Sequence, residues 1–198
     1  VRAYVQHHLD QRGGSQKLYY IGPMFRAERP QKGRQRQFHQ FGVEVIGSEN
    51  PVADVECIAF MMRIYQRIGI KNFNLKLNSV GDPESRENYK SVLKEYLEPH
   101  LEKLSELSQK RFDTNPMRIL DSKEPEDQEF IQSAPVISDH LNEESKEHFA
   151  QVCEMLSSLN IEYTLDPLLV RGMDYYTRTA FELTSPALGS QDALAGGG

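Results

Sequence analysis

The feature that most constrains the fold is a pair of alternating, aromatic-rich stretches joined by a short basic loop. Residues 18–28 and 38–46 both have strand character, and Gly33 lies in the polar loop between them. Successive side chains of a strand point to opposite faces, and a short loop between two strands joins antiparallel neighbours. The sequence therefore predicts a long antiparallel hairpin in the first quarter of the chain.

One face of this hairpin is expected to carry an unusual mixture of side chains. If both strands turn their mixed faces the same way, one floor combines a cation, two carboxylates, an amide and an aromatic ring, namely Arg26, Glu28, Phe38, Gln40 and Glu44. The opposite face is apolar and is expected to meet a core, through Tyr19, Ile21, Phe25 and Ala27.

The loop at residues 29–36 adds four cations in eight positions. Such a loop can fold over a polyphosphate, since arginine holds phosphate oxygens in bidentate fashion and a flat aromatic ring stacks on a purine. A solvated hairpin tip with ordinary surface arginines is the alternative for the loop taken by itself. The polar floor beneath the loop favours the anion site.

The remaining sequence indicates an α+β fold. Asn50-Pro51 and Asp82-Pro83 each combine a helix cap with a first-turn proline, and strand patterns recur at residues 73–80, 161–170 and 175–183. A helical, acidic stretch separates the first of these strands from the last two. We expect a mixed, mostly antiparallel sheet flanked by helices, with a helical insertion.

Charge is distributed unevenly along the chain. The net charge is -6, yet residues 1–47 hold eight Lys or Arg against three Asp or Glu, whereas residues 82–150 hold nine against seventeen. The basic end is thus where an anionic ligand is expected. No apolar run approaches the roughly 20 residues of a membrane helix, and Cys57 and Cys153 lack metal-site spacing.

Two segments resemble motifs of one enzyme family. FRAERPQKGRQRQFHQFGVEVIG, residues 25–47, is similar to motif 2 of class II aminoacyl-tRNA synthetases in the form typical of the histidine enzymes. LLVRGMDYYTRTAFE, residues 168–182, resembles the histidine-specific signature with its RGxDYY core. Both segments occur in family order, so the chain resembles a bacterial-type histidyl-tRNA synthetase catalytic domain.

This resemblance implies a reaction and a set of site residues. In the family, the carboxylate of histidine attacks the α-phosphate of ATP, and fixed cations stabilise the charge that gathers there. The catalytic residues implied are Arg26 and Arg171. The ATP-binding residues implied are Arg26, Glu28, Arg34, Phe38 and Arg171. The histidine-binding residues implied are Arg26, Gln40, Glu44, Arg171, Tyr175 and Tyr176. For the two tyrosines, a place in a strand core is the alternative.

The resemblance also implies partners and an organisation. Magnesium is expected on the outer phosphates of ATP rather than in a protein metal site, and the partners expected are L-histidine, ATP, tRNA(His) and, in the full-length protein, a second copy in a homodimer. The enzyme is expected in the cytoplasm and not in a membrane. The domains expected are a first catalytic part at 1–80, a helical insertion at 81–160 and a second catalytic part at 161–198.

Both chain ends are expected to be cuts from a longer protein, because the family's dimer motif and its C-terminal anticodon-binding domain are not found in the sequence. The fragment by itself is therefore expected to be inactive. The rival interpretation is the synthetase-like regulatory subunit of histidine biosynthesis, which shares the fold and binds histidine without charging tRNA. The intact run from Arg171 to Tyr176 favours the enzyme.

Overall fold

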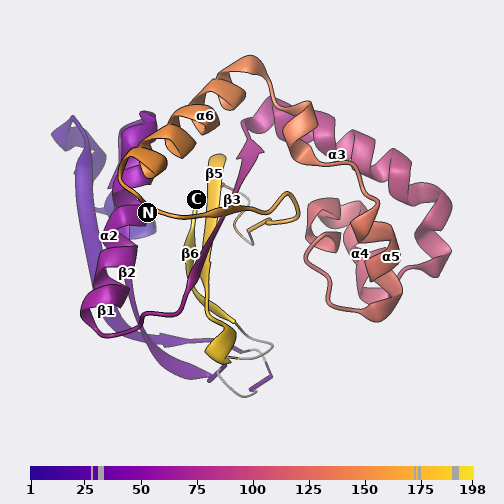
Figure 1. The fold of residues 1–198 in the computed structure, drawn as a ribbon, viewed down its shortest axis with the longest axis horizontal. Coiled ribbons are helices and arrows are strands. Elements are labelled where there is room, and N and C mark those ends of the chain that lie inside the picture. Colours follow the sequence, from indigo (N-terminus) through magenta and orange to yellow (C-terminus); the bar gives the residue numbers. More distant parts are fainter. Residues whose placement is uncertain (28, 31–33, 172, 174, 189–191) are drawn as a thin grey trace. The chain divides into compact units, whose positions relative to one another are not determined.

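The chain folds into two compact units, Val1–Gly69 and Ile70–Gly198. The structure, a computed structural model, describes residues 1–27, 29–30, 34–171, 173, 175–188 and 192–198. Figure 1 traces the chain from the indigo first unit to the yellow strands of the second.

The first unit is built on the predicted hairpin. Its elements are α1 (Arg2–Gln6), η1 (Leu9–Arg12), β1 (Gln16–Phe25), β2 (Gln37–Ile46) and α2 (Pro51–Arg67). The strands β1 and β2 are antiparallel, with a register that runs from Gln16 opposite Ile46 to Phe25 opposite Gln37. The hairpin prediction is confirmed, with β1 ending three residues earlier than the alternating pattern indicated.

Helix α2 begins where the cap signal predicted. The side-chain oxygen of Asn50 accepts a hydrogen bond of 2.9 Å from the backbone N–H of Val52, which satisfies one of the free donors in the first turn. The helix packs on the hairpin through Tyr65, whose ring centroid lies 6.4 Å from that of Phe41. Its buried side chains are Val55, Ile58, Met61 and Tyr65.

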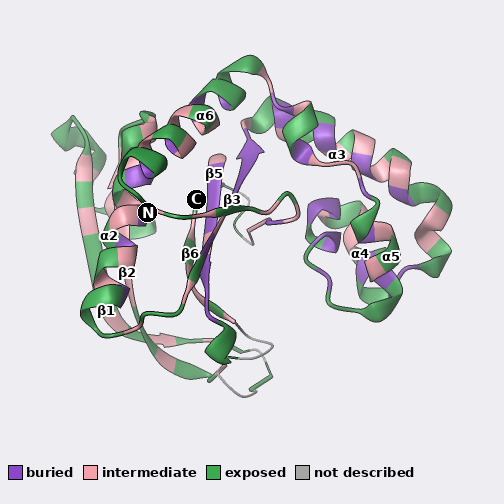
Figure 2. Cartoon of the chain, viewed as in Figure 1, coloured by how far each residue is buried: buried purple, intermediate pink, exposed green. Residues whose placement is uncertain are grey.

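The apolar face of β1 corrects one expectation. Tyr19, Ile21 and Phe25 were expected to meet a core, but they are 78%, 75% and 73% exposed, and no residue of β1 is buried (Figure 2). Ala27, expected on the same packed face, is also exposed. The physical reason is that α2 packs against β2 and meets β1 through the exposed ion pair between Glu56 and Lys17, so these side chains of β1 stay exposed.

The second unit combines a mixed sheet with helices. Its strands are β3 (Asn74–Gly81), β4 (Thr164–Leu165), β5 (Arg178–Thr184) and β6 (Ala193–Gly197), in the order β4-β3-β5-β6. Its helical elements are α3 (Pro83–Leu97), η2 (Glu98–Lys103), α4 (Glu106–Thr114), η3 (Pro116–Ile119), α5 (Pro125–Gln132), η4 (Ile137–His140), α6 (Glu143–Ser158) and η5 (Pro186–Leu188).

The observed sheet confirms the predicted α+β fold class, and two of its strands are shorter than the sequence predicted. β4 is parallel to β3, whereas β5 is antiparallel to both β3 and β6, which gives a mixed, mostly antiparallel sheet. The strand predicted at 161–170 is reduced to the two residues of β4. The strand predicted from residue 175 begins at Arg178, because Tyr175 and Tyr176 lie in a turn before it.

Helix α3 supplies much of the core of the second unit. Asp82 caps the helix by accepting a 2.9 Å hydrogen bond from the backbone N–H of Ser85. Tyr89, Leu93 and Leu97 recur every four residues and are at most 1% exposed, and burial of each such side chain contributes about 1.5–3 kcal/mol.

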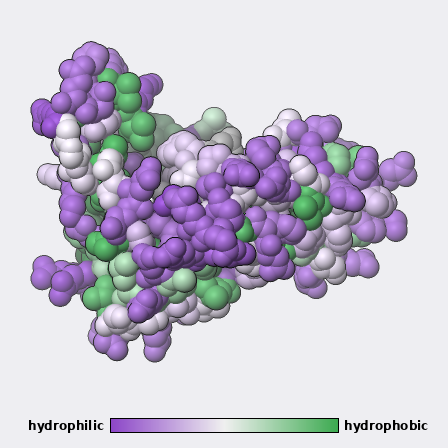
Figure 3. Space-filling model, turned by 90° about the horizontal axis from the view of Figure 1, so that it is seen from above, coloured by the Kyte–Doolittle hydropathy of each residue, from purple (hydrophilic) through white to green (hydrophobic). Residues whose placement is uncertain are grey.

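The outer surface over α3 to α5 is mainly hydrophilic on the face seen in Figure 3. No helix among the described residues is long and apolar enough to cross a membrane.

A buried carboxylate ties the helices after α3 together. Asp127 is fully buried and accepts hydrogen bonds from the backbone N–H and hydroxyl of Ser105, both at 2.8 Å, and from the hydroxyls of Ser108 at 2.6 Å and Ser122 at 2.5 Å. Burial raises the pKa of Asp127, but these hydrogen bonds outweigh it and hold the pKa below its usual value.

We expect Asp127→Asn to lower the free energy of unfolding at pH 7 by about 1–3 kcal/mol, because the amide cannot accept all of these hydrogen bonds. A carboxyl group whose pKa is lower in the folded chain than in the unfolded chain stabilises the fold at pH values above the unfolded pKa. This stabilisation is lost as the pH falls through the folded pKa. The difference from the parent chain should therefore shrink below about pH 4. Urea unfolding between pH 7 and pH 3 measures this, with the exposed Asp113→Asn as the matched control. An Asp127→Asn chain as stable as that control at pH 7 would contradict this account of the cluster.

Candidate active site

The hairpin places the expected polar side chains on one face. The pairs along this face are Leu18 with Glu44, Tyr20 with Gly42, Gly22 with Gln40 and Met24 with Phe38. Beyond β1, the backbone N–H of Arg26 donates to the carbonyl of Arg36 at 2.9 Å, which continues the pairing. Directly opposite residues share a face, so this register confirms the predicted floor for its described members. Glu28 lies outside the described residues.

Arg26 and Phe38 are in contact on this floor. The guanidinium carbon of Arg26 lies 3.8 Å from the centroid of the Phe38 ring, within the range of a cation–π interaction. Both residues are half-buried. The ring therefore supports the cation and restricts its position, which suits a group that must meet an anion in a fixed geometry.

Gln40 is held by a residue that the sequence did not single out. Its side-chain amide donates a 2.6 Å hydrogen bond to the hydroxyl of Tyr20. The Tyr20 ring lies over Gly42, where an added Cβ would stand 2.4 Å from the ring carbon that bears the hydroxyl. A glycine opposite a tyrosine is the sequence signal that could have revealed this arrangement.

The other hairpin residues lie at the two ends of the floor. Glu44 is half-buried and stands opposite Leu18, two pairs from the Gln40 position. Arg34 is half-buried and lies in the loop between β1 and β2. The floor thus presents a cation, a ring, an amide and a carboxylate in order along one hairpin.

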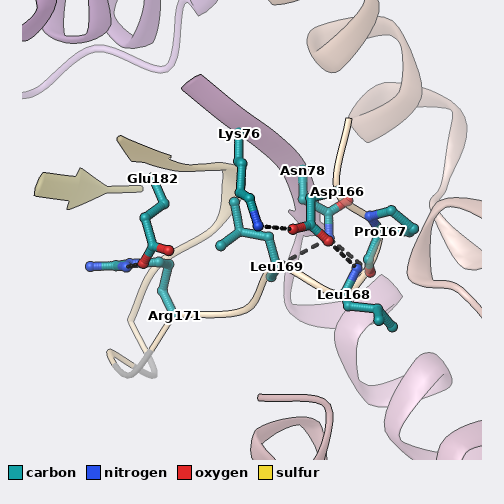
Figure 4. Close-up of polar contacts among 8 residues, drawn as sticks. All are labelled: Lys76, Asn78, Asp166, Pro167, Leu168, Leu169, Arg171 and Glu182. Carbon is teal, nitrogen blue, oxygen red and sulfur yellow. Dashed lines mark hydrogen bonds and ion pairs between the residues drawn. The ribbon is translucent and has the colours of Figure 1, made fainter. Parts of the chain in front are cut away.

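The second unit holds Arg171 against a carboxylate of strand β5. Figure 4 shows the guanidinium of Arg171 facing Glu182, with Nη1 2.6 Å from Oε2. About a quarter of each side chain is exposed. Burial raises the pKa of Glu182, and the Arg171 charge opposes that rise. The Nε of Arg171 is buried and has no hydrogen-bond partner among the described residues.

Two glycines near the end of the chain make room for the signature side chains. A Cβ at Gly196 would stand 2.6 Å from the guanidinium carbon of Arg171, and a Cβ at Gly198 would stand 2.5 Å from Cδ2 of Tyr176. Both distances are too short for real atoms, so both side chains lie directly on this backbone. The sequence interpretation did not assign a role in the site to Gly196, which lies in β6, or to Gly198, which directly follows that strand.

The two signature tyrosines stand side by side but line different spaces. Their ring centroids are 5.1 Å apart with an interplanar angle of 85°. Tyr176 lines a small cavity of about 20 Å³ together with Arg171, and Tyr175 lines a groove of about 470 Å³ beside α3. Arg86 lines both and donates a 2.7 Å hydrogen bond to the carbonyl of Tyr176.

Comparison with known proteins identifies the class and then the family. All 198 residues align with 47% of the apo histidyl-tRNA synthetase of S. aureus at 45% identity and a TM-score of 0.77, so the fold is that of a class II synthetase. The family model described as histidyl-tRNA synthetase matches residues 1–198. The chain belongs to the histidyl-tRNA synthetase family.

Two further relatives indicate the extent of the match. A histidine–tRNA ligase of Chloroherpeton thalassium is 54% identical over the whole chain, which covers 46% of that protein. A Bacillus halodurans structure described as an ATP phosphoribosyltransferase regulatory subunit/histidyl-tRNA synthetase is 25% identical, with a TM-score of 0.63, over 98% of this chain and 54% of that one. The chain spans about half the length of the curated relatives it matches.

We expect Gly42→Ala to destabilise the chain by about 1 kcal/mol or more, since the new methyl group must displace the Tyr20 ring and break its hydrogen bond with Gln40. Gly22→Ala is the matched control, because a Cβ at Gly22 meets nothing within 4 Å. Thermal unfolding of the two variants measures the difference, and Tyr20→Ala should remove the cost of Gly42→Ala. Equal melting temperatures for Gly22→Ala and Gly42→Ala would contradict the close contact.

Proposed function

We propose that this chain forms part of the active site of a histidine–tRNA ligase, which converts histidine and ATP to histidyl-adenylate and then transfers histidine to tRNA(His). The observation that carries the proposal is the match of the whole chain to the histidyl-tRNA synthetase family, with the motif 2 and signature segments both present. Arg26, which contacts the Phe38 ring, and Arg171, which pairs with Glu182, are the cations that such a site requires.

Activation begins when a carboxylate oxygen of histidine attacks the α-phosphorus of ATP. A new oxygen–phosphorus bond forms, the bond to the bridging oxygen of the β-phosphate breaks, and pyrophosphate leaves. Negative charge gathers on the α-phosphate oxygens in the transition state. Arg26 and Arg171 are the catalytic residues in this proposal, because fixed cations stabilise that charge at little cost in reorganisation.

The remaining ATP contacts come from the hairpin and its loop. Phe38 stacks on adenine, while Glu28, Arg34 and the two catalytic arginines bind the rest of the nucleotide. Magnesium accompanies the outer phosphates as part of the substrate. In the structure one face of the Phe38 ring is taken by Arg26, so the proposal puts adenine on the other face or requires Arg26 to move toward phosphate.

Selection of histidine requires polar groups that both imidazole nitrogens satisfy, since a buried group left unpaired by a wrong amino acid costs binding energy. Glu44 accepts a nitrogen-bound proton, and Gln40, held by Tyr20, contributes an amide. Tyr175 and Tyr176 complete the pocket, and Arg26 and Arg171 also contact histidine in this proposal.

The family also supports an organisation and a setting for the enzyme. We place the first catalytic part at 1–80, the helical insertion at 81–160 and the second catalytic part at 161–198. A homodimer in the cytoplasm is the state proposed for the longer protein. The acidic balance of the insertion limits any tRNA contact there to shape and a few local cations.

The rival proposal is a regulatory subunit of histidine biosynthesis. The Bacillus halodurans structure, described as an ATP phosphoribosyltransferase regulatory subunit/histidyl-tRNA synthetase, is 25% identical to the chain, whereas the S. aureus synthetase structure is 45% identical. The signature run from Arg171 to Tyr176 is intact in the sequence. Both observations favour the ligase.

The test is histidine-dependent ATP–pyrophosphate exchange in a protein of the relatives' full length that contains this chain. We expect Arg171→Ala to lower the rate by about a hundredfold or more, because it removes a charge contact to the transition state. Glu44→Gln should raise the KM for histidine by about tenfold or more, since it removes a charged acceptor for the imidazole.

The matched control is Arg67→Ala, which removes an exposed arginine from the last turn of α2 and should leave the rate unchanged. No exchange activity in the parent protein would favour the regulatory subunit. A rate within about threefold of the parent for Arg171→Ala would remove its catalytic assignment.

A further inference from the structure

The signature arginine comes from an irregular segment, not from a strand or helix. Arg171 precedes β5 by seven residues and lies outside the helices and strands of the second unit. An arginine side chain has several rotatable bonds, and a catalytic cation must be held close to its productive geometry to be effective. Some other group therefore has to fix the guanidinium.

Glu182 is placed to do this. It lies within β5, opposite Lys76 of β3 on one side and Gly196 of β6 on the other, so its backbone is fixed by strand pairing in both directions. Its carboxylate oxygen lies 2.6 Å from Nη1 of Arg171. The neighbouring cation, Lys76, is 2.9 Å from Asp166, and Figure 4 shows two separate ion pairs across this sheet.

The contact with Glu182 does not use the whole guanidinium, and about a quarter of the Arg171 side chain stays exposed. An arginine carries five N–H donors in a planar fork. Glu182 engages Nη1, while the buried Nε has no hydrogen-bond partner among the described residues. Gly196 closes the side of the guanidinium that faces β6, because no side chain fits there. The Arg171 guanidinium is thus held by Glu182 and bordered by the backbone of Gly196, while its Nε still lacks a hydrogen-bond acceptor among the described residues.

We infer that Glu182 is a positioning residue for the reaction, which orients Arg171 toward the substrate anion through its ion pair with Nη1. This inference rests on the proposed catalytic role of Arg171. Glu182 itself touches neither substrate in this account. Its effect on the rate must therefore pass entirely through Arg171.

The experiment is a double-mutant cycle in pyrophosphate exchange, in a protein of the relatives' full length. Glu182→Gln should lower kcat by about tenfold or more while the KM for histidine stays within about threefold, as expected for an interaction realised in the transition state. In an Arg171→Ala background, the same substitution should change kcat by less than about twofold, because coupled residues are non-additive.

Two further variants separate positioning from a merely structural role. Asp166→Asn breaks the neighbouring ion pair, which is comparably buried, and should leave kcat within about twofold because Asp166 does not pair with Arg171. Gly196→Ala moves the guanidinium by another route and should lower kcat as Glu182→Gln does. In the Arg171→Ala background, Glu182→Gln should also raise the melting temperature, since it removes a carboxylate left without its cation.

The outcomes distinguish this inference from the proposed function. If Arg171→Ala is severely impaired but Glu182→Gln matches the parent, the positioning role is wrong and the ligase proposal stands. Equal losses from Glu182→Gln in both backgrounds would also overturn the positioning role, because they would place its effect outside Arg171. If Arg171→Ala itself retains the parent rate, the catalytic assignment fails first.

Discussion

The pairing of β3, β5 and β6 is the constraint on which the candidate chemistry of the second unit depends. It sets Glu182 opposite Gly196. A hydrogen-bond acceptor and a residue without a side chain therefore lie next to each other where the Arg171 guanidinium packs on the sheet. The Glu182 carboxylate pairs with the guanidinium, and the absence of a side chain at Gly196 leaves room for the guanidinium against the strand. Both residues owe their place beside Arg171 to strand register rather than to local sequence.

The first unit achieves the same result with different chemistry. Arg26 also follows the end of a strand, and an aromatic ring supports it where a carboxylate supports Arg171. A glycine again leaves room for a side chain, since Gly42 lies beneath the Tyr20 ring that holds Gln40. In both units, a partly buried functional group lies against paired strands, and in the proposed function this arrangement reduces the entropy lost when a charged ligand binds.

The parts of this architecture set by local rules were predictable. Asn50 and Asp82 cap helices that begin at the prolines after them, and strand alternation gave the described members of the hairpin floor. The parts set by distant partners were not. Coverage of Tyr19 depends on where α2 packs, and the role of Glu182 depends on β5 pairing with β3, about a hundred residues earlier in the chain. The roles of individual site residues and the domain boundaries stay predictions, because they concern ligands and a longer protein.

The central claim is that Arg26 and Arg171 act on one reacting phosphate. It is tested most directly by a crystal structure of a protein of the relatives' full length, containing this chain, with a non-hydrolysable analogue of histidyl-adenylate bound. The account predicts that both guanidinium groups lie within hydrogen-bond distance of the group that replaces the α-phosphate. A structure in which the analogue is bound and either arginine lies away from that group would contradict it.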